Sequence, residues 1–379
     1  MPSLDAFCYS GAPTHPPQQG PPSRRLPRDE RISGLSHVLL VKLTSMGDLI
    51  QLLPALSDAH AQRPELRFDW VADAAFAEIP GWHPAVGRVI PSAHRDWRRH
   101  KTEFLCSGSA RAWLRRLRER RYDRVIDAQG SWKSAVMARV ARGPSAGLDA
   151  DSVREPGAQW LYQERHFVAR EQLAITRWRQ LLAAVLDYPV PATAPDFGLT
   201  GRVWPDPPLT LAAPTLTFVT NATWPTKLWP DAHWRELIGI AIGAGYQVVL
   251  PWGSAPEQER AERLAHAQSG ARVPPRASLG EIAGLLSRSA AVVSVDTGLA
   301  HLAAALGRPT LTLYGPTDPR LIAATGPRAA PLPATGYPCI PCRRRECRVA
   351  DYRGPDARCM QDLTPALVWA RLQTLLAAV

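Results

Sequence analysis

The chain has 379 residues, 45% of them hydrophobic, so it is long enough for two domains with substantial cores. No apolar run approaches the roughly 18–20 residues of a transmembrane helix, and the polar, proline-rich start is unlike a secretory signal. We therefore expect a cytoplasmic protein. The net charge of +11 indicates acidic partners such as nucleic acid, anionic lipid or a phosphorylated sugar.

Proline-rich stretches divide the chain. Residues 1–33 combine many prolines with polar side chains and predict a disordered extension, because they can bury little apolar surface. Residues 189–214 are proline-rich again and predict an interdomain linker. This division gives an N-terminal domain at 34–188 and a C-terminal domain at 215–379 that ends in a cysteine-rich tail.

The N-terminal part alternates strands and helices. An apolar strand is expected at 37–42, then a loop containing Gly47, then a helix at 49–56. Further strands are expected at 68–72, 88–91 and 124–130, and further helices at 110–121 and from 133. This alternation predicts a parallel sheet covered by helices on both faces.

The same pattern restarts after the linker. Strands are expected at 216–220, 247–250, 291–295 and 310–315, with helices beginning at 231, 256, 279 and 302. We therefore predict two doubly wound halves that meet across a cleft. Open sheets of this kind bind ligands at the carboxyl ends of their strands, so the glycine-containing loops of both halves should line the cleft.

Residues 294–302 contain one of these loops. Asp296, Thr297 and Gly298 follow an apolar strand and precede a helix, so backbone N–H groups and a helix dipole should converge on one point that suits a phosphate. Thr297 adds a hydroxyl donor, and His301 falls one turn into the helix. The alternative is an ordinary helix cap formed by Asp296 or Thr297.

The other loop, residues 43–48, lies in the N-terminal half and places Asp48 at a helix start. The helix dipole and nearby N–H donors should keep this carboxylate ionised. A simple N-cap aspartate is the alternative interpretation.

Several motifs resemble a known family. They occur at 41–48, 68–71, 81–83, 88–91, 250–253, 294–298 and 314–319. In order and without large gaps, they are similar to the lipopolysaccharide heptosyltransferases of glycosyltransferase family 9. The resemblance implies the GT-B fold, in which two Rossmann-like doubly wound domains face each other across a cleft. It also implies an inverting enzyme that moves L-glycero-D-manno-heptose from ADP-heptose to the Kdo of Kdo-lipid A during lipopolysaccharide inner-core synthesis.

The resemblance also implies roles for residues of the donor side. Asp48 would be the general base and Lys227 would stabilise the leaving diphosphate, while Ala222 replaces one family threonine near the phosphates. Glu257 would hold the ribose, although a plain helix-start glutamate is the alternative, and His301 could be a packed helix histidine. The expected donor-binding residues are Thr223, Lys227, Glu257, Asp296, Thr297, Gly298 and His301. No cofactor or metal is expected, because no metal-binding carboxylate pair is apparent.

The acceptor side is expected to be basic, because Kdo carboxylates and lipid A phosphates are anionic. The expected acceptor-binding residues are Ser45, Met46, Gly47, Arg95, Arg98, Arg99, Lys101, Lys133 and Arg154. A solvated basic face is the alternative for each basic residue. The same basic patch would give a monomeric protein peripheral contact with the cytoplasmic face of the inner membrane.

Two other functions remain open at this stage. One is a related heptosyltransferase that acts on a later inner-core acceptor. The other is a non-enzymatic nucleic-acid-binding protein, suggested by the charge and by the cysteines, although no recognition module is visible. Cys339, Cys342, Cys347 and Cys359 could close a structural zinc site. We favour separate reduced thiols, because the gap between Cys347 and Cys359 is not a standard knuckle.

Overall fold

The computed structural model describes residues 36–93, 108–211, 214–349 and 357–378. The predicted disordered extension, 1–33, lies outside these residues, as do Arg95, Arg98, Arg99 and Lys101. Among the helices in the described part of the chain, none is long and apolar enough to cross a membrane.

The first half of the chain forms a six-stranded parallel sheet in the order β3-β2-β1-β4-β5-β6. This is the strand order of a dinucleotide-binding doubly wound fold. Its strands are β1 (His37–Val41), β2 (Arg67–Asp73), β3 (Val86–Ser92), β4 (Arg124–Asp127), β5 (Ser145–Leu148) and β6 (Glu164–His166).

Helices cover both faces of this sheet, and the alternation of side chains along β1 shows how. Val38 and Leu40 pack into the cluster formed with α1 (Met46–Gln62) and α6 (Ala174–Leu186). Leu39 and Val41 point to the other face, which is covered by α4 (Ser109–Leu117) and α5 (Trp132–Val140). Three short 3-10 helices complete this half: η1 (Ala74–Phe76), η2 (Pro80–Trp82) and η3 (Ala158–Leu161).

The second half repeats the arrangement. Its parallel sheet has the order β12-β11-β10-β7-β8-β9, which is the same winding counted from β7. Its strands are β7 (Thr215–Val219), β8 (Gln247–Val249), β9 (Ala271–Arg272), β10 (Ala291–Val295), β11 (Thr310–Tyr314) and β12 (Ala329–Pro333). Its helices are η4 (Pro225–Lys227), α7 (Asp231–Gly243), α8 (Ala255–Ala265), α9 (Leu279–Arg288), α10 (Gly298–Ala305), α11 (Pro319–Ile322), α12 (Arg358–Gln361) and α13 (Pro365–Ala377).

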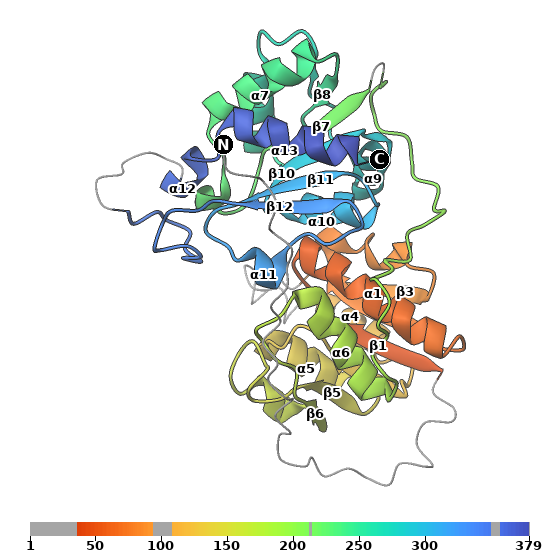
Figure 1. Ribbon diagram of the computed structural model, residues 1–379. Helices are drawn as coiled ribbons and strands as arrows, with labels where there is room; N and C mark the ends of the chain where they lie inside the picture. The colour runs from red at the N-terminus through yellow and green to blue at the C-terminus, as the bar shows by residue number, and fades with distance from the viewer. Residues whose placement is uncertain (1–35, 94–107, 212–213, 350–356, 379) are drawn as a thin grey trace.

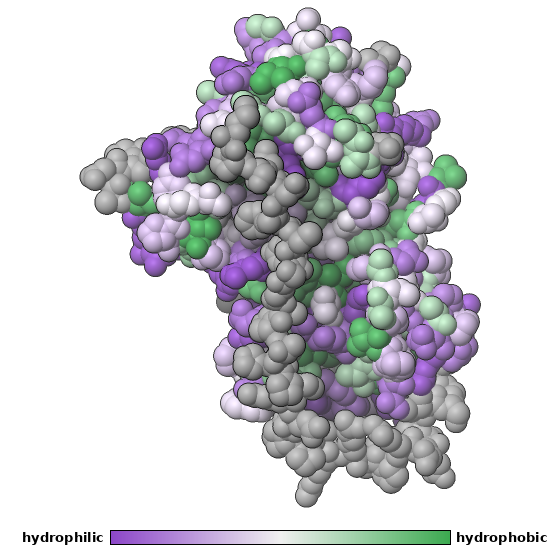
Figure 2. Space-filling view, viewed as in Figure 1, coloured by the Kyte–Doolittle hydropathy of each residue, from purple (hydrophilic) through white to green (hydrophobic). Residues whose placement is uncertain are grey.

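The two halves are stacked, with α10 of the second half against α1 of the first (Figure 1). Within the second half, α13 packs against α7. On the face seen in Figure 2, hydrophilic and intermediate residues cover most of the surface and hydrophobic ones are scattered. The buried clusters of each half lie between its sheet and its helices, and the two sheet orders confirm the predicted pair of doubly wound units.

Several helix boundaries differ from the prediction. Helix α1 runs from Met46 to Gln62 instead of from 49 to 56, and α10 begins at Gly298 instead of 302, so Gly47 and Gly298 both lie in the first turn of their helices. Helix α4 ends at Leu117 instead of 121. At the end of this helix the Arg88 guanidinium donates to the Arg116 carbonyl in the last turn and to the Glu119 carboxylate just beyond it, which holds the chain in a turn.

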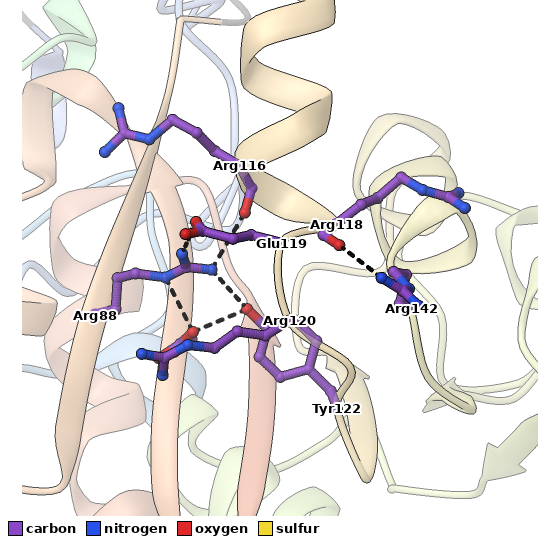
Figure 3. Close-up of polar contacts among 8 residues, drawn as sticks. Arg88, Arg116, Arg118, Glu119, Arg120, Tyr122 and Arg142 are labelled. Carbon is purple, nitrogen blue, oxygen red and sulfur yellow. Dashed lines mark hydrogen bonds and ion pairs between the residues drawn. The ribbon is translucent and has the colours of Figure 1, made fainter.

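That turn belongs to a cluster of polar side chains around the buried Asp69 (Figure 3). The Tyr122 hydroxyl donates to Asp69 at 2.8 Å, and Arg88 Nε lies 3.1 Å from the same carboxylate. Burial, followed by the neighbouring Asp69 carboxylate, raises the pKa of Tyr122 to about 12, so its hydroxyl remains a donor at neutral pH. The cluster anchors the end of α4 to β2 and β3.

Candidate active site at the contact of the two glycine loops

Asp48 lies in the first turn of α1, at the carboxyl edge of the first sheet. Its Oδ2 accepts hydrogen bonds from the backbone N–H and the hydroxyl of Ser45, both at 2.8 Å. Ser45 is therefore the N-cap residue of α1, and Asp48, three residues later, completes a capping box by accepting hydrogen bonds from it. Asp48 thus contributes to the cap without being the N-cap residue itself. The other oxygen, Oδ1, is 3.5 Å from Lys42 Nζ.

Lys42 is a site residue that the sequence analysis did not single out. It follows β1 directly, and its side chain is buried with the ammonium 4.0 Å from the centre of the Trp178 ring. Burial lowers the pKa of Lys42, against the attraction of Asp48 and Asp127. A lysine at the end of an otherwise apolar buried strand was the available signal, because such a charge requires a partner.

The environment keeps Asp48 ionised. Burial opposes its charge, but the Lys42 ammonium and the hydrogen bonds from Ser45 outweigh that cost and hold the pKa of Asp48 below its ordinary value. Arg154, an exposed residue on the loop after β5, lowers this pKa further. The site thus presents a carboxylate with basic neighbours.

Asp296 directly follows β10 of the second sheet and is also paired with a lysine. Its Oδ2 lies 2.6 Å from Lys227 Nζ and accepts a hydrogen bond from the Thr317 hydroxyl at 2.7 Å. Thr297 occupies the N-cap position of α10, but its side chain makes no capping hydrogen bond. The first turn of α10 therefore directs its backbone N–H groups toward the neighbourhood of Lys227, as an anion site requires.

The two loops touch. A Cβ atom added to Gly47 would lie 2.5 Å from His301 Cδ2, and one added to Gly298 would lie 2.6 Å from Met46 Cβ. Glycine is needed at both positions for this close approach. Burial lowers the pKa of His301, against the nearby Asp296 and Asp48, so its imidazole is neutral at pH 7. Asp48 and Lys227 thus come from opposite sides of one contact between the two halves.

The remaining predicted donor residues belong to the second half of the chain. Thr223 is exposed on the loop between β7 and η4, and Lys227 is the last residue of η4. Glu257 Oε2 accepts hydrogen bonds from the backbone N–H groups of Gly253 and Ser254, at 2.8 and 3.1 Å. One oxygen of Glu257 therefore caps the start of α8, as the alternative interpretation expects, and the role of Glu257 in binding the ribose stays a prediction.

The cysteine-rich tail packs against the segment that contains Trp224, Thr226 and Lys227. The Thr226 hydroxyl donates to the Arg344 carbonyl at 2.6 Å, and the Arg345 guanidinium lies 5.5 Å from the ring centre of Trp224, which Lys227 also approaches. Cys359 is buried, and burial, followed by the nearby thiols, raises its pKa to about 12. The four cysteines at 339, 342, 347 and 359 are unbridged, and the described residues contain no cluster of His, Cys, Asp or Glu suited to a metal ion.

Comparison with known proteins identifies the family. Residues 110–353 match glycosyltransferase family 9 (heptosyltransferase). The chain is 46% identical over 351 residues to lipopolysaccharide heptosyltransferase 1 of Pseudomonas aeruginosa, across 90% of this chain and 98% of that protein. The chain belongs to glycosyltransferase family 9. A second member of family 9, lipopolysaccharide heptosyltransferase 1 of Escherichia coli, is 44% identical over 290 residues, across 76% of this chain and 91% of its own.

Solved structures of family 9 agree with the fold. The structure of E. coli heptosyltransferase WaaC with ADP has a TM-score of 0.78 and 39% identity, across 89% of this chain and 99% of that one. This similarity confirms the predicted GT-B arrangement of two Rossmann-like units. A more distant member, lipopolysaccharide heptosyltransferase 2 of Salmonella typhimurium, is 28% identical over 361 residues, across 89% of this chain and 98% of its own.

Proposed function

We propose that this chain is an ADP-heptose-dependent lipopolysaccharide heptosyltransferase that transfers L-glycero-D-manno-heptose to the Kdo of Kdo-lipid A. The observation that carries the proposal is the meeting of the two loops, which brings Asp48 to one side of a contact and Lys227 to the other. Membership of family 9 supplies the class of reaction.

In this reaction Asp48 accepts the proton of the acceptor hydroxyl. The hydroxyl oxygen forms a bond to the anomeric carbon of the heptose while the bond from that carbon to the diphosphate oxygen breaks. ADP leaves with the bonding electrons, and the ammonium of Lys227 and the N-terminus of α10 stabilise the negative charge on its phosphate. Because attack and departure occur on opposite faces of the sugar, the configuration at this carbon inverts.

The assignment to Kdo-lipid A, instead of a later inner-core acceptor, follows the relatives. Identity is 46% and 44% to two proteins named heptosyltransferase 1 and 28% to one named heptosyltransferase 2. Lys133 in the first turn of α5 and Arg154 beside Asp48 would bind acceptor carboxylate or phosphate groups. A monomer with peripheral contact at the cytoplasmic face of the inner membrane fits this acceptor.

The decisive experiment measures ADP release from ADP-heptose with three acceptor conditions: none, Kdo-lipid A, and Kdo-lipid A that already carries one heptose. We expect rapid release only with Kdo-lipid A, and unchanged rates in the presence of a chelator. A preference for the heptosylated acceptor would instead assign the later step. Release that is independent of any acceptor would contradict transfer altogether.

A further inference from the structure

Positive charge is concentrated in one part of the chain. Residues 109–142 contain ten lysine or arginine residues and only three acidic ones, a net charge of +7 out of +11 for the whole protein. Asp127 is one of the three and is buried, and Glu119 is bonded to Arg88. Arg120 and Arg124 form ion pairs with Asp69 and Glu164 outside this segment, and most of the other basic side chains are exposed.

These residues form a single face of the first domain. Helices α4 and α5 cover the same side of the sheet, and they touch at their carboxyl ends, where Arg118 donates to the Val140 carbonyl at 2.9 Å. The guanidinium groups of Arg116 and Arg118 point away from the cluster around Asp69 (Figure 3). We call this surface the α4–α5 face. Its basic members are Arg111, Arg115, Arg116, Arg118, Lys133, Arg139 and Arg142.

The α4–α5 face also exposes apolar side chains. The exposed residues of α5 are Trp132, Lys133, Val136 and Arg139, which share one side of the helix, and Leu114 is exposed on α4. Trp160 of η3 is 71% exposed and packs edge-on against Trp132, with ring centres 6.3 Å apart. Tryptophan and aliphatic side chains set among arginines are typical of surfaces that lie in a membrane interface.

We propose that the α4–α5 face docks on the surface of a bilayer that contains anionic headgroups. The arginines would neutralise the headgroups, while Leu114, Trp132, Val136 and Trp160 enter the interfacial layer. The inference rests on the proposed function, because a lipid-linked acceptor must be reached at a membrane. A nucleic acid would gain little from the aliphatic side chains, and a second copy of so basic a face would be repelled.

The position of the tryptophans ties this face to the active site. The Trp132 backbone N–H donates to the Glu155 carboxylate at 2.9 Å, and the neighbouring Arg154 is close enough to Asp48 to lower its pKa. Trp132 starts α5, directly after the loop that follows β4 at the carboxyl edge of the sheet. Docking would therefore bring the acceptor side of the site to the membrane surface.

Co-sedimentation with vesicles tests the proposal. The probes are phosphatidylcholine vesicles with and without about one third phosphatidylglycerol, and the variant is Arg115→Glu/Arg139→Glu. We expect the wild type to bind only the anionic vesicles. The variant should bind at least about 30-fold more weakly, because each basic residue near an anionic surface contributes about 1 kcal/mol and the two glutamates add repulsion. Trp160→Ser should weaken the binding that persists at high salt.

The matched control is Arg263→Glu/Arg371→Glu, which changes the net charge equally at exposed arginines of α8 and α13. This control should bind vesicles like the wild type, and thermal unfolding should show that both double variants are folded. Equal weakening by both pairs would reduce the effect to net charge and overturn the proposal. Loss of a dimer in the Arg115 and Arg139 variant, or preference of the wild type for duplex DNA over vesicles, would overturn it too.

Transfer assays separate this inference from the proposed function. With a deacylated, water-soluble Kdo acceptor, the Arg115→Glu/Arg139→Glu variant should match the wild type. With Kdo-lipid A in anionic vesicles, it should be at least tenfold slower. Equal loss with both acceptors would place these arginines in acceptor binding and contradict membrane docking. Failure of the wild type to use either acceptor would instead refute the proposed function, whatever the vesicle result.

Discussion

The loop between β1 and α1 and the loop between β10 and α10 are each lined by a paired aspartate and lysine, but they expose opposite charges. Lys42 and Asp48 flank the first loop, with 3.5 Å between Nζ and the carboxylate, whereas Asp296 of the second loop lies 2.6 Å from Nζ of Lys227, which comes from η4. In the first pair the lysine side chain is 3% exposed and the aspartate 32%. In the second pair the aspartate is 4% exposed and the lysine 17%.

The difference shows how the same kind of ion pair can provide either a base or an anion-binding group. In the first loop the hidden ammonium of Lys42 keeps the more exposed Asp48 ionised, so the loop offers a base. In the second loop the hidden carboxylate of Asp296 holds the Lys227 ammonium at the start of α10, so the loop offers an anion site. Burial of the lysine thus leaves a carboxylate that can accept a proton from the acceptor, and burial of the aspartate leaves an ammonium that can bind the phosphates of a sugar nucleotide.

The largest effect should come from removing the exposed charge of the first pair. Asp48→Asn keeps the size and the hydrogen bonds to Ser45 but cannot accept a proton, so we expect turnover to fall by roughly 10²–10⁴-fold, the usual contribution of a general base. ADP-heptose affinity, measured by calorimetry, should change little. Near-normal turnover would leave Asp48 with only its role at the helix start.

The exposed charge of the second pair should matter next. Lys227→Ala removes a charged donor to phosphate, so ADP and ADP-heptose should bind about 10–100-fold more weakly, since hydrogen bonds to charged groups contribute about 1.5–3 kcal/mol. The variant should also unfold at lower temperature, because the buried Asp296 loses its partner. The matched control, Lys227→Ala/Asp296→Asn, should recover stability but not ADP binding. Unchanged ADP affinity in Lys227→Ala would contradict the anion site.

Both glycine loops could be predicted from the sequence, because each follows an apolar strand and precedes a helix. The strand at 37–42 and the strand at 291–295 are continuous buried runs, and they appear as β1 and β10 with nearly the same limits. The sequence points to Asp48 and Asp296 from their positions between a strand and a helix, and to Lys227 from family resemblance. The structure pairs each aspartate with a lysine, while their roles in the reaction stay predictions.

The interaction partners of the site residues could not be predicted in this way. The Lys42 ammonium packs on the ring of Trp178 of α6, more than a hundred residues away in the chain, and the Thr226 hydroxyl donates to the Arg344 carbonyl of the tail. Neither pairing leaves a periodic pattern in the sequence, because each depends on how separate elements pack. The short strands β5 and β6 are absent from the predicted elements for a related reason: three or four residues carry little pattern of their own.

The contact between the two loops can be tested by filling it. Gly47→Ala would place a Cβ atom 2.5 Å from His301 Cδ2, and overpacking of this kind costs about 1–3 kcal/mol. We expect kcat/KM to fall about tenfold, because the clash separates Asp48 from the second loop. The control is Gly108→Ala, where nothing lies within 4 Å of the added atom, and it should behave like the wild type. Equal activity of the two variants would show that the contact is dispensable.

The smallest effect should come from the hidden lysine of the first pair. The positive charge of Lys42 lowers the pKa of Asp48, so Lys42→Met should raise it, and the base should be lost to protonation at a higher pH than in the wild type. The acid limb of the kcat/KM profile therefore moves to higher pH. Activity on that limb should fall several-fold, while the plateau at neutral pH stays close to the wild type. Arg154→Met should move the limb in the same direction but less, because the charge of Arg154 acts more weakly on Asp48 than that of Lys42. If the acid limb of the Lys42→Met profile stays in place or moves to lower pH, the buried ammonium does not control the charge of Asp48. The contrast between the two ion pairs would then rest on Lys227 and Asp296 alone.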